Sequence, residues 1–243
     1  MGGRRTGIGP DVLILGIETA TMQVGCAVGG HEGVLSSVHS AKGKRHAEQL
    51  VPSIQFACEQ ARVELAEIGL VAVDVGPGLF TGLRVGVATA KALAFSLKVP
   101  MIGVSSLDLL AFPVRFSNRL IVTAIDARRG ELYYACYRQV PGGVQRITDL
   151  QIGSPDDLAS ELLASGEEVL LVGDGAQRHA ESFEGLAKVE LVDTGNSHPS
   201  AAALVELAHA RALREEFERP DAIEPVYLRR PDAEINWSTR DGR

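Results

Sequence analysis

Two acidic residues, Glu18 and Asp126, are the best candidates in this sequence for metal or phosphate chemistry. Each stands at the end of a continuous apolar run that predicts a buried strand. A carboxylate in that place can hold a divalent cation beside a phosphate. Such a site also needs a glycine whose backbone lets the phosphate approach, whereas Thr19-Ala20 and Ala127-Arg128 follow the two acids. A structural role for both acids is therefore favoured over catalysis.

A glycine-rich segment at 76–84 is the second candidate. Glycines permit close backbone approach, a threonine can cap the helix that follows, and free N–H groups at a helix start can hold an anion. No Gly-Lys-Ser/Thr follows, so the segment is not a Walker A loop. A turn that positions the next helix is the preferred interpretation, and the alternative anion site would use Gly76, Gly78, Thr81 and Arg84.

Other catalytic or metal-binding patterns find no support. The six histidines include no pair spaced to share a metal on a helix, and neither His-Glu-x-x-His nor Gly-x-Ser-x-Gly occurs. The three cysteines are far apart and form no Cys-x-x-Cys. We therefore expect no metal site and no disulfide framework, which fits a cytoplasmic protein.

Composition limits the possible partners. Of the 243 residues, 45% are hydrophobic and 23% charged, and the net charge is −7. No apolar run reaches the ~20 residues of a membrane helix. An acidic chain is not expected to bind RNA over its main surface, so contact with RNA is expected through a partner, or at the basic end at 228–230.

Hydrophobic periodicity predicts the same element order twice. Each half is expected to read βββαβαβα, which indicates an internal duplication and an α/β fold of the actin-like (ASKHA, ribonuclease H-like) class. The alternative is a mixed α/β protein with accidental symmetry. The expected divisions are a flexible leader at 1–11, halves at 12–115 and 116–216, and a tail at 217–243. The predicted strands are 12–17, 24–28, 34–38, 70–74, 100–104, 120–126, 132–138, 144–147, 169–172 and 189–192. The predicted helices are 46–62, 81–97, 107–115, 155–165, 176–183 and 200–216.

The predicted helices 46–62 and 81–97 carry more apolar surface than one contact requires. The second is apolar on several sides, which is typical of a helix buried on more than one side. Small residues four apart form a ridge along it that could admit another helix. A subunit interface and simple coverage of the sheet explain this pattern equally well. The candidate interface residues are Leu50, Ile54, Ala57, Ala61, Gly82, Gly86, Val87, Ala90 and Lys91.

Several short segments together resemble the TsaB (YeaZ) family in order and spacing, over about residues 12 to 230. They are Ile17-Glu18-Thr19-Ala20-Thr21, His46-Ala47-Glu48-Gln49-Leu50, the segment 76–84, Ile102-Gly103-Val104-Ser105-Ser106-Leu107, Ile125-Asp126-Ala127-Arg128-Arg129-Gly130-Glu131 and Glu224-Pro225-Val226-Tyr227-Leu228-Arg229.

This resemblance implies a partner subunit rather than an enzyme. Members of the family pair with the catalytic subunit TsaD through helices of their N-terminal halves, and also with themselves. With the ATPase TsaE, the complex transfers threonylcarbamoyl to the tRNA adenosine beside the anticodon. TsaD has a His-x-x-x-His metal motif where this chain has Ser105-Ser106-Leu107-Asp108-Leu109. The resemblance thus implies a non-catalytic subunit without a metal, which meets tRNA only through the complex.

Two further hypotheses stay open at this point. The duplicated fold and glycine-rich turns are also compatible with a free-standing actin-like ATPase or small-molecule kinase. A peptidase is a third class, but the sequence offers no nucleophile for it. No cofactor is expected in the isolated chain, although ATP or ADP at the interface of the complex is compatible with the resemblance.

Overall fold

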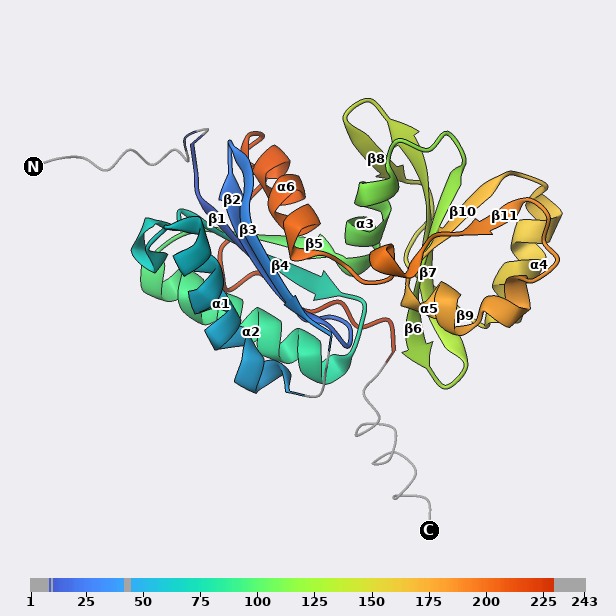
Figure 1. Ribbon diagram of the computed structural model, residues 1–243, viewed down its shortest axis with the longest axis horizontal. Coiled ribbons are helices and arrows are strands. Elements are labelled where there is room, and N and C mark those ends of the chain that lie inside the picture. The colour runs from blue at the N-terminus through green and yellow to red at the C-terminus, as the bar shows by residue number, and fades with distance from the viewer. Residues whose placement is uncertain (1–8, 10, 42–44, 230–243) are drawn as a thin grey trace, which may run out of the picture.

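The computed structural model describes residue 9 and residues 11–41 and 45–229. Its first sheet has the strand order β3-β2-β1-β4-β5 (Figure 1). Strands β1 to β3 form an antiparallel meander, and β4 and β5 continue the sheet parallel to β1. The strands are β1 (Ile14–Glu18), β2 (Val24–Gly30), β3 (Gly33–Ser40), β4 (Leu70–Gly76) and β5 (Met101–Ser105).

The second sheet repeats this topology with the order β11-β10-β6-β7-β8, and the short strand β9 pairs with β7. Again three strands run antiparallel and two continue parallel to the first. The strands are β6 (Leu120–Arg128), β7 (Glu131–Val140), β8 (Gly143–Arg146), β9 (Gln151–Gly153), β10 (Val169–Val172) and β11 (Val189–Leu191). This repetition confirms the predicted duplicated actin-like α/β fold.

Serine side chains cap the start of α3, α4 and α6, whereas α1, α2 and α5 have no side-chain cap among the described residues. Ser154 caps α4 and Ser200 caps α6, each accepting a backbone N–H bond. The predicted cap Thr81 is wrong, because α2 already begins at Phe80 after Leu79 and has no side-chain cap. The helices are α1 (His46–Ala61), α2 (Phe80–Leu97), α3 (Ser106–Ala111), α4 (Pro155–Ser165), α5 (Asp174–Arg178) and α6 (Ala201–Ala212). Single 3₁₀ turns are η1 (Leu65–Glu67), η2 (Phe112–Val114), η3 (Ala180–Phe183) and η4 (Thr194–Asn196).

The two halves exchange their last helices. Helix α6 crosses back to cover the face of the first sheet opposite α1 and α2, while α3 packs against β6 and β7 (Figure 1). Gly16 lets α6 approach, because a Cβ there would lie 3.1 Å from the carbonyl oxygen of Ala201. Chain order alone placed α6 with the second half, at 116–216. In space each sheet is completed by a helix from the other half.

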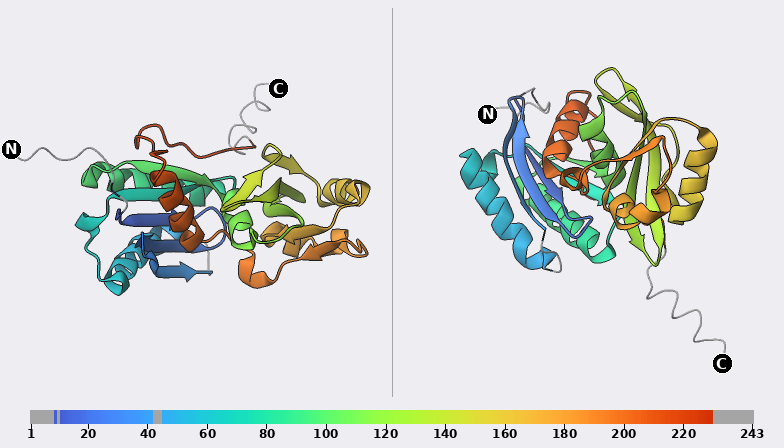
Figure 2. Two further views of the ribbon diagram at one scale, coloured as in Figure 1. Left: turned by 90° about the horizontal axis from the view of Figure 1, so that it is seen from above. Right: turned by 45° about the vertical axis from the view of Figure 1, so that its right-hand side comes forward.

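The chain then returns across both halves. Met101 forms a β-bridge with Glu218, and the Val226 N–H donates to the Val75 carbonyl at 2.7 Å. This return segment, 217–229, lies along one side of the molecule (Figure 2). The predicted tail at 217–243 is therefore packed as far as residue 229. Residues 230–243 of that tail, and residues 1–8 and 10 of the predicted leader, lie outside the described residues.

Four clusters of buried apolar side chains fill the spaces between sheets and helices in the described chain. One lies under α1 and α2, and a second lies under α6. Cys26, Cys58 and Cys136 are all free thiols. Among the described helices, none combines the length and the apolar character needed to cross a bilayer.

Candidate functional site

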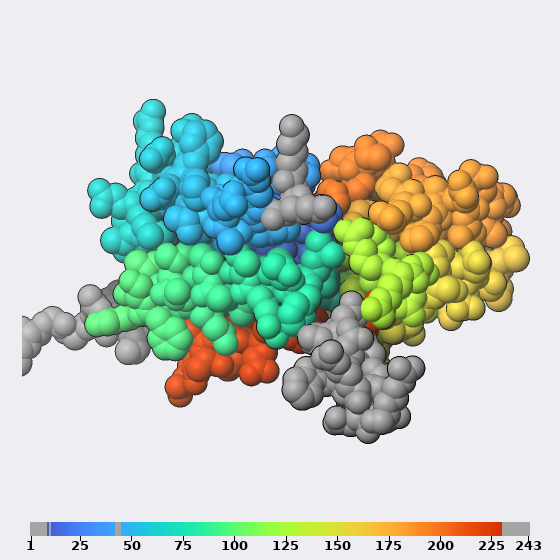
Figure 3. Space-filling view, turned by 90° about the horizontal axis from the view of Figure 1, so that it is seen from below, coloured from blue at the N-terminus to red at the C-terminus, as the bar shows by residue number. Residues whose placement is uncertain are grey.

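Helices α1 and α2 lie side by side over one face of the first sheet (Figure 3). Their inner sides carry most of the residues predicted to form a subunit interface. These side chains are buried in the chain's own core, so in this conformation they cannot contact a second molecule. The buried residues are Leu50, Ile54, Ala57, Gly82, Gly86, Val87 and Ala90, while Ala61 and Lys91 are half-buried.

The glycine ridge of α2 packs against the end of β1 rather than against a partner helix. A Cβ at Gly82 would lie 2.1 Å from the Thr19 carbonyl oxygen, and one at Gly86 would lie 2.1 Å from Thr19 Oγ1. The Thr19 hydroxyl also donates to the Gly82 carbonyl at 2.8 Å. Of the two interpretations left open for this ridge, a subunit interface and contact within the chain, these distances favour the second. Its small residues are required by contact within the chain.

The solvent-facing sides of the two helices are apolar at several positions. Phe56 on α1 is 50% exposed and Phe95 on α2 is 60% exposed. We call this surface the outer face and define it by Val51, Phe56, Ala88, Ala92 and Phe95, all of them exposed. Aromatic side chains are enriched in protein interfaces, so the exposed Phe56 and Phe95 make the outer face a candidate surface for a partner.

A groove extends the outer face at the end of α2. It has a volume of about 560 Å³ and lies between the last turn of α2 and the beginning of the return segment. Figure 3 shows these two elements, green and red, next to each other. Its walls are almost entirely apolar. The lining residues are Ala94, Phe95, Lys98, Val99, Pro100, Phe217, Glu218, Arg219 and Pro220.

The glycine-rich segment uses its backbone donors within the chain. The Gly76 N–H donates to Asp74 Oδ1 at 2.8 Å, and the Leu79 N–H donates to the Ala20 carbonyl at 2.7 Å. Arg84 stacks on Phe80, with its guanidinium carbon 3.9 Å from the ring centre. Of the proposed anion site Gly76, Gly78, Thr81 and Arg84, these contacts occupy the Gly76 N–H and the Arg84 guanidinium. The segment therefore acts as a turn that positions α2.

Two buried carboxyl groups meet at the carboxyl ends of β1 and β4. Ile17 pairs with Val73 in the parallel ladder, so Glu18 and Asp74 stand next to each other. Both are fully buried, and one oxygen of each, Glu18 Oε2 and Asp74 Oδ2, has no hydrogen-bond partner. Burial raises the pKa of Glu18 well above its usual range, and the nearby Asp74 adds to this rise.

The protonation of this pair bears on whether it could bind a metal ion. Burial raises the pKa of Asp74 to about 7, while hydrogen bonds from Ser106 and the Gly76 N–H oppose the rise. A neutral carboxyl is a poor ligand for a divalent cation. No cluster suited to a metal ion is found among the described residues. Sequence reasoning named Glu18 but missed Asp74 as its neighbour, because only the strand order brings them together.

In the second half, Asp126 holds arginines rather than a metal. Its Oδ2 lies 3.1 Å from Nη1 of Arg128 and 3.4 Å from Nε of Arg178. The side chain of Asp174 reaches the Asp126 N–H at 3.3 Å. Burial raises the pKa of Asp174, and the nearby His198 opposes this rise. The two acids nominated from the sequence, Glu18 and Asp126, are linked through Asp174, whose charge contributes to the raised pKa of Glu18 and whose Oδ1 accepts the Asp126 N–H.

Comparisons with known proteins place this architecture in a family. Residues 33–237 match the family model described as "TsaD: tRNA N6-adenosine threonylcarbamoyltransferase". The tRNA threonylcarbamoyladenosine biosynthesis protein TsaB of Bacillus subtilis is 30% identical over 93% of this chain and 98% of its own length. The chain belongs to the TsaB (YeaZ) family.

Other relatives align with nearly the whole chain. The Escherichia coli protein of the same name is 29% identical, covering 95% of this chain and 99% of its own length. An uncharacterized protein of Mycobacterium leprae is 36% identical over 91% of this chain, which spans 56% of that longer protein.

Solved structures support the TsaB fold. The structure of YeaZ from Pseudomonas aeruginosa superposes with a TM-score of 0.78 at 27% identity, covering 89% of this chain and all of that one. Component A of the (R)-2-hydroxyglutaryl-CoA dehydratase of Acidaminococcus fermentans has a TM-score of 0.50 at 11% identity, which shows a shared fold alone.

Proposed function

We propose that this chain is a non-catalytic scaffold subunit that pairs with the catalytic subunit TsaD and, with the ATPase TsaE, supports threonylcarbamoyl transfer to the tRNA adenosine next to the anticodon. The reaction takes place in the cytoplasm. Family membership supports the pathway, since the relatives are named for tRNA threonylcarbamoyladenosine biosynthesis. The observation that carries the scaffold role is the apolar outer face of α1 and α2.

The outer face has the composition of a protein interface. Aromatic anchors such as Phe56 and Phe95 contribute most of the binding free energy in such interfaces. Few charged side chains lie between them on α2, where Ala88 and Ala92 expose only methyl groups. The groove beside Phe95 offers a recess for an apolar side chain of the partner. The same surface explains pairing between two copies of this chain when TsaD is absent.

The ends of β1 and β4 and the glycine-rich turn after β4 support a non-catalytic role. The buried acids Glu18 and Asp74 favour the neutral form, and the amides of Gly76 and Leu79 are already bonded. Ser105 and Ser106, where TsaD has metal-binding histidines, cap α3 and bond to Asp74. Catalysis is therefore assigned to the partner, and any ATP or ADP of the complex to the interface between subunits.

Charge placed on the outer face tests this proposal. We expect a Phe56→Glu/Phe95→Glu chain to form no heterodimer with TsaD in native mass spectrometry, because two carboxylates would be buried without partners. Leu163→Glu is the matched control, since Leu163 is an exposed apolar residue on α4, in the other half. It should leave the heterodimer intact. An unchanged heterodimer in the doubly charged variant, with its fold verified by circular dichroism, would overturn the proposal.

A further inference from the structure

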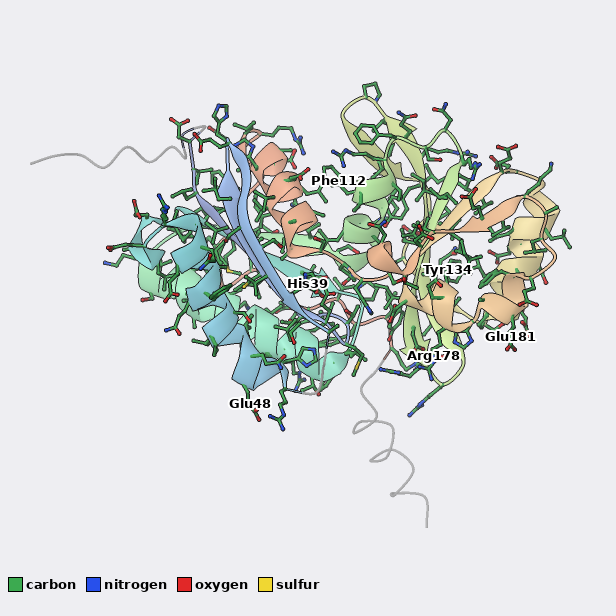
Figure 4. The ribbon with its side chains drawn as sticks, viewed as in Figure 1. His39, Glu48, Phe112, Tyr134, Arg178 and Glu181 are labelled. Carbon is green, nitrogen blue, oxygen red and sulfur yellow. The ribbon has the colours of Figure 1, made fainter. Side chains whose placement is uncertain are left out.

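Arginines from three separate segments gather at the carboxyl end of β6. Arg128 ends β6, Arg129 lies in the β6–β7 turn, Arg178 ends α5, and Arg229 ends the return segment. In Figure 4, Arg178 lies beside the lower end of β6, and in Figure 3 the β6–β7 turn reaches the surface next to the start of α2. In this arginine cluster the arginines outnumber the acids paired with them, because Arg128 and Arg178 share Asp126, and Arg229 pairs with Glu131.

Asp126 orients two members of the cluster. Its buried carboxylate lies within ion-pair distance of both Arg128 and Arg178, and its Oδ1 accepts the Arg128 N–H at 2.9 Å. The two arginine side chains are 45% and 60% exposed. A guanidinium has five donors in a planar fork, so one that is held by Asp126 can still bind a phosphate through two others. Two guanidinium groups fixed around one carboxylate form a pre-oriented clamp.

The backbone of the turn holds arginines where other residues would fit better. Arg128 and Arg129 have φ of 64° and 57°, and Gly130 follows with φ of 74°. This left-handed region is strained for residues with a side chain, and a two-residue hairpin of this kind favours Asn-Gly or Gly-Gly. Arginine is therefore not the residue that the backbone of this turn favours.

An aromatic pair lies beside the cluster. Tyr227, two residues before Arg229, packs on Phe80 with ring centres 5.2 Å apart, and its hydroxyl accepts a bond from Arg84 Nε at 3.3 Å. Arginine forks next to a partly exposed aromatic ring suit a nucleic acid, which offers both phosphates and bases that stack.

We propose that Arg128 and Arg178, positioned by Asp126, bind an RNA phosphodiester, with Arg129 adding positive charge beside them and Arg229 held by its ion pair with Glu131. The inference rests on the proposed function, in which the substrate of the complex is tRNA. It goes beyond that function because the chain itself, and not only its partner, contacts the RNA.

Binding of a fluorescently labelled tRNA transcript to the isolated full-length chain tests the clamp. In fluorescence anisotropy we expect Arg128→Gln/Arg178→Gln to weaken binding about tenfold or more at low salt, and to reduce the slope of log affinity against log salt by about two. Arg119→Gln/Arg138→Gln is the matched control. These arginines belong to the opposite ends of β6 and β7 and are also ion-paired. This control should change affinity less than twofold.

Asp126→Asn separates a positioning role from simple charge. Removing a negative charge should tighten RNA binding if only net charge matters, whereas the clamp predicts weaker binding because both guanidinium groups lose their anchor. Circular dichroism and the melting temperature verify that each variant is folded. If the Gln double variant is partly unfolded, Arg128→Lys/Arg178→Lys replaces it. Lysine keeps the positive charge but lacks the planar guanidinium donors, so this variant should also bind tRNA more weakly than wild type.

Three outcomes overturn the inference. The first is that the wild-type chain shows no saturable tRNA binding. The second is that the control double variant loses as much tRNA affinity as Arg128→Gln/Arg178→Gln. The third is that ATP displaces the tRNA while chloride at the same ionic strength does not. The last would indicate a nucleotide site. Heterodimer formation with TsaD is measured in parallel on the same variants. Because the arginine cluster and the outer face are separate, loss of RNA binding with intact pairing is expected, and each proposal can fail without the other.

Discussion

At the scale of single residues, the hydroxyl oxygen of Thr19 explains why position 86 is a glycine. Small residues spaced four apart on a helix are equally suited to a partner helix and to a close contact inside the chain. The hydroxyl of Thr19 occupies the space where a Gly86 side chain would begin. A bulky substitution at Gly86 would therefore disturb the fold of this chain, and it is no clean probe of subunit pairing.

This contact predicts a measurable coupling. We expect Gly86→Ala to lower the free energy of unfolding by about 1–3 kcal/mol, as overpacking of a buried site does. In a Thr19→Ala background the same change should cost less, because the atom at 2.1 Å is removed. Urea denaturation of the four chains gives the coupling as a double-mutant cycle. Additive effects would show that the two residues do not meet.

Asp74 makes a second prediction at this scale, in the pH dependence of stability. Its pKa of about 7 in the folded chain exceeds the value near 4 of an unfolded chain. Between these values the folded chain holds a proton that the unfolded chain has released. The contribution of Asp74 to stability therefore falls as pH rises through this window.

Replacement by the uncharged isostere tests this linkage. Asp74→Asn cannot lose a proton, so its stability relative to wild type should increase from pH 5 to pH 8, with a slope of at most about 1.4 kcal/mol per pH unit. Urea midpoints of both chains across this range give the difference. A difference that does not change with pH would contradict the shifted pKa.

At the scale of elements, α1 and α2 carry apolar residues both on their inner sides and on their outer face. The inner sides close the first core, and the outer face is left uncovered. Helical periodicity revealed that the second helix was apolar on more than one side, but it did not tell which residues face the sheet. The exposed apolar residues Val51, Phe56 and Phe95 were therefore missed, and their inner neighbours were nominated instead.

The two sides of α2 should respond differently to truncation. Val87→Ala should cost roughly 1–3 kcal/mol of folding stability, because Val87 is buried and a cavity results. Phe95→Ala should leave the urea midpoint almost unchanged, yet weaken pairing with TsaD in native mass spectrometry or analytical ultracentrifugation. The reverse pattern would show that the outer face is not the contact surface.

At the scale of the whole molecule, the exchange of α3 and α6 makes the two halves depend on each other. Leu204 and Ala208 of α6 belong to the core of the first sheet, and Leu107 and Leu110 of α3 belong to that of the second. An ion pair between Arg115 and Glu206, at 3.8 Å, joins the regions of these two helices.

The exchange predicts that the first half does not fold alone. A chain of residues 1–117 lacks α6 and would expose the apolar side of its sheet to water. We expect it to show no cooperative urea transition, unlike the full chain. A sigmoidal transition with native-like circular dichroism would show that α6 is dispensable for the first sheet.

The glycine-rich turn after β4 and the buried acids beside it give one more prediction at this scale. Calorimetric titration of the isolated chain with Mg-ATP should show no saturable heat, because the Gly76 and Leu79 amides are bonded within the chain and two buried acids lie nearby. Tight binding with turnover would favour the ATPase or kinase hypothesis instead.

The sequence by itself determined the elements and their repetition. Most strands and helices lie within a few residues of their predicted positions, because alternation and helical periodicity are local properties of the chain. Errors remain where the local signal is weak, as at α5, which ends at Arg178 rather than extending to 183.

Only the tertiary structure decided how those elements meet. It brought Glu18 next to Asp74, placed α6 on the sheet of the other half, and gathered Arg128, Arg178 and Arg229 around the end of β6. These contacts join residues far apart in the chain, so no periodicity or spacing encodes them. Likewise, an apolar side chain favours burial without specifying its neighbour, and packing of the complete chain selects which side of a helix remains for a partner.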